Sequence, residues 1–202
     1  MPNWKTLFLL SNLFLLAACG TVRFPAEVSC EMVSENIQNT YFTSEKPQIF
    51  LFRLLFKDNQ QSGIFVHKKT GDDRHRVVIS SLFGGTMLDM TLDREDYTVN
   101  YVVEDLNKKF LLNLLYRDFL LLVNEHYPVT QRIETQTQTI YQSQQSYLVV
   151  EAGQLQQIQL VKGKKKKIQI DYTSGNGILK HATLKHFNLP VSIELDLKTE
   201  NE

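Results

Sequence analysis

Residues 105–126 constrain most strongly how this 202-residue chain can fold. Their apolar side chains recur every three or four positions, which is typical of an amphipathic helix, whereas the sequence on both sides reads as strands and turns. Asp105 stands where a helix cap is expected, and Pro128 follows the expected end. We therefore expect one long helix whose apolar face contains Leu106, Phe110, Leu114 and Leu121, with Leu111, Leu115, Phe119 and Leu122 beside them.

The flanking segments predict a long antiparallel sheet. Before the helix, apolar runs at 48–57, 64–67, 74–83, 86–93 and 97–103 are separated by turn-rich clusters such as 58–63 and by the Gly84-Gly85 pair. After it, residues 147–150, 155–161, 165–172, 178–187 and 191–197 repeat this pattern. The expected fold class is α+β, with the sheet packed around the helix.

Composition narrows the classes of partner. Hydrophobic residues make up 43% of the chain, and 22 basic side chains balance 22 acidic ones. A nucleic-acid partner is not expected, because nucleic-acid binders carry an excess of positive charge. The 2 cysteines exclude a disulfide-rich miniature fold, and a monomer with one globular domain is expected.

The N-terminus reads as an export signal. Lys5 precedes an apolar run at 7–16, which Ser11 and Asn12 interrupt, and the small residues Ala17 and Ala18 follow. The run is shorter than the roughly 20 apolar residues that a membrane-spanning helix needs. We therefore expect cleavage to remove residues 1–18 as a signal peptide.

The end of this segment, Leu16, Ala17, Ala18, Cys19 and Gly20, resembles the bacterial lipobox. The resemblance implies that Cys19 becomes the first mature residue and carries acyl chains such as palmitate, which would anchor the protein in a membrane. Gly20 in place of Asp implies the inner leaflet of the outer membrane, facing the periplasm. The alternative is an ordinary signal peptide that contains a cysteine near its cleavage site.

The mature chain divides into a lipidated tether at 19–41, in which a short helix at 32–37 is expected, and one domain at 42–202. Within that domain, residues 74–123 (RHRVVISSLFGGTMLDMTLD through DFLLLV) resemble an uncharacterised family of bacterial lipoproteins with the LolA/LolB-like fold of lipoprotein localisation factors. The resemblance implies an incomplete barrel closed by helices over an apolar cavity for acyl chains. Candidate lining residues are Leu106, Phe110, Leu114, Leu115, Phe119 and Leu122, and Leu82 and Phe83 are candidates for a loop at the cavity mouth.

Other constellations give weaker signals. His181 and His186 are five residues apart in a predicted strand, so they would face opposite sides, and we expect no metal site and no cofactor. No nucleophile elbow, zinc-protease helix or P-loop motif is present. Cys30 is expected to be a bystander. The lysine cluster at 162–167 reads either as a solvated turn with edge-protecting lysines or as a contact to anionic head groups or peptidoglycan.

The sequence therefore predicts a membrane-anchored binding or transfer protein for an acyl chain, lipid or lipoprotein, rather than an enzyme. The alternative is a structural or accessory envelope lipoprotein without a ligand.

Overall fold

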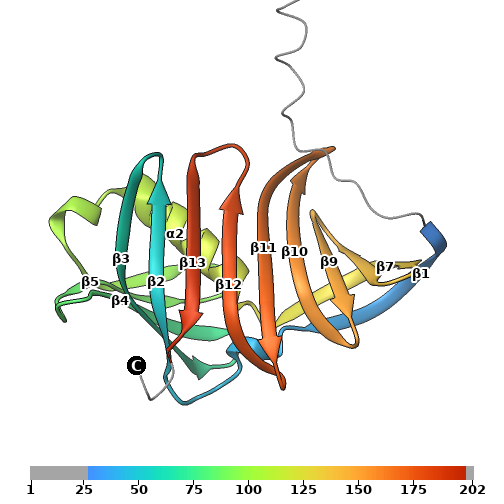
Figure 1. Cartoon of the computed structure of the whole chain (residues 1–202), viewed down its shortest axis with the longest axis horizontal. Coiled ribbons are helices and arrows are strands. Elements are labelled where there is room, and N and C mark those ends of the chain that lie inside the picture. Colours follow the sequence, from blue (N-terminus) through green and yellow to red (C-terminus); the bar gives the residue numbers. More distant parts are fainter. Residues whose placement is uncertain (1–26, 199–202) are drawn as a thin grey trace, which may run out of the picture.

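The computed structural model describes residues 27–198, in which one antiparallel sheet wraps around one helix (Figure 1). The chain first forms β1 (Glu27–Gln38), the 3-10 turn η2 (Thr40–Phe42), β2 (Gln48–Phe56), β3 (Asn59–Gly71), β4 (Arg74–Ser81), β5 (Thr86–Leu92) and β6 (Tyr97–Val102). The 3-10 turn η3 (Glu104–Leu106) leads into α2 (Lys109–Val123). The second half comprises β7 (His126–Thr135), β8 (Thr139–Ser143), β9 (Ser146–Glu151), β10 (Gln154–Lys162), β11 (Lys165–Gly175), β12 (Ile178–His186) and β13 (Val191–Leu197).

The sheet contains 13 strands in the order β1-β7-β8-β9-β10-β11-β12-β13-β2-β3-β4-β5-β6. Its two halves are joined by β13, the last strand, which pairs antiparallel with β2 from Val191 opposite Phe56 to Leu197 opposite Phe50. β1 and β6 are the two edge strands, so the barrel is incomplete. The expected fold class, a curved antiparallel sheet around one long helix, is confirmed.

The position of α2 in the chain explains the curvature of the sheet. It follows the edge strand β6 and precedes β7, the second strand from the other edge, eleven positions away. A flat sheet would place those strands about 53 Å apart at about 4.8 Å per strand, whereas a helix of 15 residues is only about 22 Å long. The connecting segments are short and the first of them is tightened by η3, and the sheet curls until its two sides face each other across the helix, as Figure 1 shows.

Strand alternation supplies the apolar inside of this curl. In β2, Phe50 and Phe52 are buried, whereas Ile49, Leu51 and Arg53 on the opposite face are exposed. Aromatic side chains pack together on the buried face. The ring of Phe65 in β3 stacks on that of Phe52, with 6.4 Å between the ring centroids. One face of the sheet is thus the core and the other faces solvent.

Two expected elements differ from the structure. Residues 27–38, expected to belong to a tether with a short helix at 32–37, form the strand β1, because the edge of β7 offers unpaired backbone groups and Val33 and Ile37 pack against the core. The helix begins at Lys109 rather than Asp105, because residues 104–106 tighten into η3 and Asn107 leaves helical geometry with ψ 58°. Among residues 27–198, no helix has the length and hydropathy needed to span a membrane.

The turn expected at 58–63 is also shorter than predicted. The β2–β3 hairpin turns at Lys57, which has φ 55°, and Asp58, so Gly63 lies inside β3 opposite Phe52 and Ser81. A Cβ atom on Gly63 would lie 2.3 Å from the carbonyl oxygen of Ser80. Close approach of β4 therefore explains this glycine.

We predict that Gly63→Ala lowers the free energy of unfolding by about 1–3 kcal/mol, because β4 must move away from the new methyl group. Gly71→Ala in the same strand is the matched control, since its Cβ would meet only the Arg74 side chain at 3.6 Å. The control should change stability by no more than about 0.5 kcal/mol. Urea denaturation of both variants checks this, and equal effects would show that the Ser80 contact is unimportant.

Candidate functional site at the helix–sheet interface

One face of α2 packs against the inside of the sheet. The side chains of Leu112, Leu115, Phe119 and Leu122 recur at helical spacing and are buried. Phe119 is fully buried, and its ring lies 5.4 Å from that of Phe65 in an edge-to-face contact. This interface is where an apolar ligand would have to enter if one binds inside the fold.

The six candidate lining residues differ in burial and do not all belong to the helix. Leu115, Phe119 and Leu122 lie on the buried face of α2, and Leu114 is partly buried beside it. Leu106 belongs to η3, outside the helix. The prediction that Phe110 lines the interior is wrong, because its side chain is 73% exposed. Apolar residues cover so much of the surface of this helix that their spacing in the sequence could not predict which of them are buried.

The C-terminal end of α2 is firmly held by buried polar groups. The hydroxyl of Tyr127 donates to the carbonyl of Leu121 at 2.8 Å, and the hydroxyl of Tyr172 donates to the carbonyl of Leu122 at 2.8 Å. Asn39 adds a side-chain N–H to the same Leu122 carbonyl at 3.1 Å. These carbonyls have no partner within the helix, so the three side chains satisfy groups that burial would otherwise leave unpaired. Burial raises the pKa of both phenols, which keeps them protonated as donors.

The N-terminal end of α2 is less firmly held. Its cap residue, Lys108, makes no side-chain capping bond, and the first turn contains no acidic residue to complement the helix dipole. Two phenol bonds connect this half of the helix with strand β6 and the turn before it. Tyr97 of β6 donates to Asn113 at 2.7 Å, and Tyr116 donates to the carbonyl of Asp93 at 3.0 Å. Both bonds are only partly buried.

A buried acid–histidine pair fixes the middle of the helix. His186 Nε2, at the end of β12, lies 2.8 Å from Asp118 Oδ2, and both residues are at least 94% buried. Burial raises the pKa of the Asp118 carboxyl, and the bond to His186 partly offsets that effect. The other carboxylate oxygen, Oδ1, has no hydrogen-bond partner among the described residues.

A second buried polar chain lies below the C-terminal end of the helix. Gln48 donates to the carbonyl of Tyr41, which leaves its side-chain oxygen 3.1 Å from His67 Nδ1. With Nδ1–H donating there, His67 Nε2 accepts from His75 Nδ1 at 2.9 Å. Burial, reinforced by the neighbouring His75, lowers the pKa of His67 to about 3.

Glu125, in the segment that follows α2, terminates this polar chain. Its Oε2 accepts from Lys69 Nζ at 2.8 Å, whereas its Oε1 lies 3.6 Å from His75 Nε2. Burial lowers the pKa of His75 although Glu125 acts in the opposite direction. Since His67, His75 and Glu125 are all at least 95% buried, no substrate reaches them in this conformation, and they serve to fix the helix end to β3 and β4.

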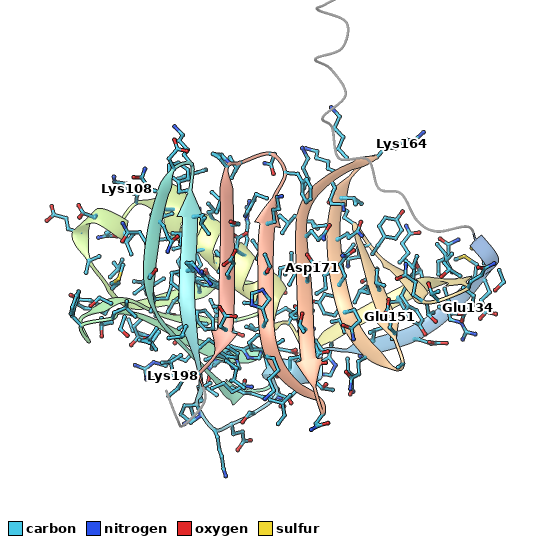
Figure 2. All side chains as sticks on the ribbon, in the orientation of Figure 1. Lys108, Glu134, Glu151, Lys164, Asp171 and Lys198 are labelled. Carbon is cyan, nitrogen blue, oxygen red and sulfur yellow. The ribbon has the colours of Figure 1, made fainter. Side chains whose placement is uncertain are left out.

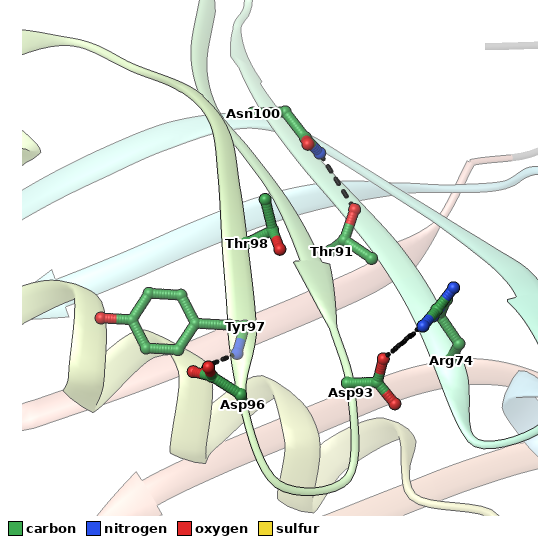
Figure 3. Close-up of a pocket in the computed structure, with 7 residues that line it drawn as sticks. All are labelled: Arg74, Thr91, Asp93, Asp96, Tyr97, Thr98 and Asn100. Atoms are coloured by element: carbon green, nitrogen blue, oxygen red, sulfur yellow. Dashed lines mark hydrogen bonds and ion pairs between the residues drawn. The ribbon is translucent and has the colours of Figure 1, made fainter.

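A polar pocket lies elsewhere, near the turn between β5 and β6 (Figure 3). It has a volume of about 470 Å³ and is lined by Arg74, Thr91, Asp93, Asp96, Tyr97, Thr98 and Asn100. Arg74 and Asp93 form an ion pair at 2.8 Å, and Asn100 donates to Thr91 at 3.0 Å. The pocket is open and hydrophilic, so it does not suit an acyl chain. Among the described residues, no group of three or more His, Cys, Asp or Glu side chains is arranged to hold a metal ion.

The candidate mouth loop forms the turn between β4 and β5. Phe83 is fully exposed and Leu82 is 59% exposed. Gly84, at φ 91°, closes the turn by donating its N–H to the Ser81 carbonyl at 3.0 Å. The start of β5 is linked to the segment before η3 by a bond from Val103 N–H to the Met87 carbonyl at 3.0 Å. The loop therefore lies at the same end of the sheet as the N-terminus of α2.

The lipidation candidates fall outside the described residues. These are Leu16, Ala17, Ala18, Cys19 and Gly20. Cys30 is an exposed free cysteine in β1, where Gln131 donates to its sulfur at 2.8 Å. His181 and His186 do face opposite sides of β12, since His181 pairs with Asp196 on the outer face at 2.7 Å.

The sequence pattern did not predict the polar side chains that hold α2. Asn39, Tyr127 and Tyr172 are far from the helix in sequence or lie in strands where they read as ordinary core residues. Asp118 offered the one usable signal, because an acidic side chain within a row of Leu and Phe residues requires a buried partner.

Comparisons with known proteins give structural likenesses only. No family model and no curated protein sequence matches the chain. The structure is similar to a LolA superfamily protein from Nitrosomonas europaea (TM-score 0.47, 10% identity, covering 81% of this chain and 87% of that one). It is also similar to a DUF1329 family protein from Desulfovibrio piger (TM-score 0.40, 9% identity, covering 78% of this chain and 85% of that one). A third likeness is to a putative outer membrane lipoprotein-sorting protein domain from Vibrio parahaemolyticus (TM-score 0.41, 4% identity, covering 79% of this chain and 86% of that one). At these values the likenesses carry no functional argument.

We predict that the protein loses stability in acid partly through His67. Its pKa is lower in the folded chain than in the unfolded one, so its contribution is present above about pH 6.5 and is lost as the pH falls towards about 3. His67→Gln should reduce the slope of unfolding free energy against pH in this window by up to about 1.4 kcal/mol per pH unit. Urea denaturation at several pH values measures the slope, and His75 contributes with the same sign in both proteins.

An independent readout is the ring-proton NMR signal of His67, which should not titrate until the pH approaches 3. Equal slopes in the two proteins, or a His67 signal that titrates near pH 6.5, would contradict the prediction.

Proposed function

We propose that this chain is a lipid-anchored envelope protein that binds an acyl chain, of a lipid or of a lipoprotein, between α2 and the sheet, and that it acts as a carrier or receptor without catalysis. The proposal places the protein at the periplasmic face of the outer membrane. Three features support it: the lipobox-like N-terminus, the apolar inside of the curled sheet, and the way α2 is attached.

The unequal attachment of α2 carries the proposal. Buried side chains hold its last carbonyls, whereas its first turn lacks a capping side chain, and two partly buried phenol bonds, at Asn113 and Tyr116, hold the rest of its N-terminal half. Each such bond contributes about 1 kcal/mol to stability, so the polar bonds add little to the cost of separating the N-terminal half from the sheet, and that cost comes mainly from its buried apolar side chains. A helix fixed at one end and weakly tied at the other is suited to act as a lid.

Opening this half would expose apolar side chains on both surfaces. Leu112 and Leu115 of the helix and the inward side chains of β5, such as Leu88 and Met90, are buried together in the closed form. An acyl chain placed between them would restore burial at about 0.8 kcal/mol per methylene group. Phe83 lies exposed at the same end, where it is placed to contact a chain that enters.

The proposed anchor keeps the domain close to its membrane. Cys19 precedes Glu27, the first residue of β1, by eight residues, so a lipid on Cys19 would hold β1 within about 28 Å of the bilayer surface. Several acyl chains on one residue provide lasting attachment, whereas a single chain binds only reversibly.

A structural envelope lipoprotein without a ligand is the second candidate. Phe119 favours it, because this side chain is fully buried against Phe65 and fills the centre of the helix–sheet interface in the closed form. Measured binding of an acyl probe decides between the two.

We predict that Cys19→Ser abolishes lipid labelling of the protein. Cells grown with radioactive palmitate should label the unchanged chain and not the variant, since only a thiol at the lipobox position accepts the diacylglyceryl group. Cys30→Ser is the matched control and should retain full labelling. Labelling that survives Cys19→Ser would refute the lipobox assignment while leaving the acyl-binding proposal to its own test.

We predict that loosening the N-terminal half of α2 increases affinity for an acyl probe. The double variant Tyr97→Phe/Tyr116→Phe removes both phenol bonds without altering the apolar face. Each lost bond should raise the open population, and so the apparent affinity, about fivefold. Titration of full-length Cys19→Ser protein with a fluorescent fatty acid measures this change.

Tyr101→Phe provides the control, because Tyr101 lies on the same strand with an exposed side chain. It should bind the probe as the parent protein does. Absence of binding in every variant would exclude the acyl-binding function and favour the structural role.

A further inference from the structure

The exposed phenylalanines of the described chain gather at one end of the sheet. They are Phe56, Phe83, Phe110 and Phe187, each 42–100% exposed. Phe56 ends β2, Phe83 lies between β4 and β5, Phe110 begins α2 just after β6, and Phe187 follows β12. In an antiparallel sheet, the turns that follow alternate strands emerge at the same end, and this rule places all four residues at the same end of their strands.

Lysines occupy the same end. Lys162 ends β10, Lys164 lies in the turn that follows, and Lys165, Lys166 and Lys167 begin β11. Figure 2 shows Lys164 and Lys108 along the upper side of the molecule and Lys198 along the lower side. The turns at residues 162–167 and 187–190 contain no acidic residue. The opposite end instead carries acidic turns at 72–73 and 93–96.

Backbone hydrogen bonds and ring contacts join the turns at residues 57–58, 162–167 and 187–190 into one surface. The backbone N–H of Phe187 donates to the Lys167 carbonyl at 2.9 Å, and that of Lys57 donates to the Pro190 carbonyl at 3.0 Å. Lys166 and Lys185 both hold their ammonium groups over the Phe187 ring, at 5.1 and 5.7 Å from its centroid.

A third such contact places the ammonium group of Lys57 5.6 Å from the centre of the Phe56 ring. We call this surface the aromatic–lysine rim and define it by Phe56, Lys57, Phe187, residues 162–167 and Lys185.

Protection of a sheet edge does not explain these lysines. β10 and β11 lie inside the sheet, where each has a hydrogen-bonded neighbour on both sides, and the edge strands within residues 27–198 are β1 and β6. Exposed aromatic rings beside cations are instead the combination that suits a membrane surface, because rings enter the head-group region while ammonium groups remain at the phosphates.

We propose that the aromatic–lysine rim docks on the surface of a bilayer that contains anionic phospholipid, with Phe56 and Phe187 inserted at head-group depth. This docking sets the orientation of the domain on its membrane. It goes beyond acyl binding in the interior and does not depend on it, since the rim consists of surface residues outside the helix–sheet interface.

Vesicle sedimentation tests the charge requirement. Full-length Cys19→Ser protein should bind phosphatidylcholine vesicles more tightly when phosphatidylglycerol is included. Lys164→Glu/Lys165→Glu should weaken binding to the anionic vesicles by about 30-fold or more, since each basic residue near such a surface contributes about a factor of five. Lys180→Glu/Lys198→Glu makes the same change of charge at the other end and should retain affinity within about twofold.

If both double variants lost affinity for the anionic vesicles equally, net charge alone would explain the effect, and the proposal would be overturned. So would unchanged binding of the Lys164/Lys165 variant, or no preference for phosphatidylglycerol. Because all variants share the same N-terminal segment, its own affinity for lipid cannot produce a difference between them.

Tryptophan fluorescence tests the orientation. Trp4 is the only tryptophan, so Trp4→Phe provides a background without indole emission. Phe187→Trp in that background should shift to the blue on anionic vesicles and be quenched by brominated phospholipid. Ile178→Trp, an exposed apolar position at the other end, should show neither change. Quenching at position 178, or its absence at 187, would show that the rim does not face the bilayer.

Discussion

The connection through α2 determines the shape of the molecule. A single helix of 15 residues joins strands that lie near opposite edges of a 13-stranded sheet, and this is possible only if the sheet bends around the helix. Bending turns one sheet face into the inside of a half-closed barrel and lets that face bury itself without a second layer. The core, the buried row of α2 and the two unpaired edges all result from this one connection.

The same connection makes the helix the least anchored part of the core. Strands are held by continuous ladders, whereas α2 depends on its apolar row and on a few side-chain bonds. Tyr127, Tyr172 and Asn39 satisfy its last carbonyls, and the Asp118–His186 pair fixes its middle. Buried ionisable pairs stabilise little compared with apolar packing, but they define one position of a helix on a smooth apolar surface. The polar ties therefore specify where the helix rests and leave its first turns with the weakest hold.

Sequence patterns predicted the architecture well because it depends on periodicity. The change from alternating strands to the helical row around Leu115 and Phe119 established one sheet and one helix, and the expected faces of His181 and His186 follow from strand geometry alone. Strand β1 was missed because few of its side chains are apolar and, among those whose burial is described, only Val33 and Ile37 pack against the core, so pairing of its backbone with β7 stabilises it. Phe110 was misplaced because the helix is apolar on almost every side. The networks around His67 and Asp118 join residues 8–68 positions apart, and no local pattern records such contacts.

Alternation of the hairpins also gives the molecule an electrical polarity. The formal charge is zero, yet the lysine turns and the acidic turns emerge from opposite ends of the sheet. A body of this kind is drawn only weakly towards a charged surface but is turned by it, because the field acts in opposite directions on its two ends. At physiological ionic strength such a torque operates only within about 8 Å of a surface. If the chain is tethered as proposed, it would stay within reach of that field, so a neutral sequence could still have a preferred side facing the lipid.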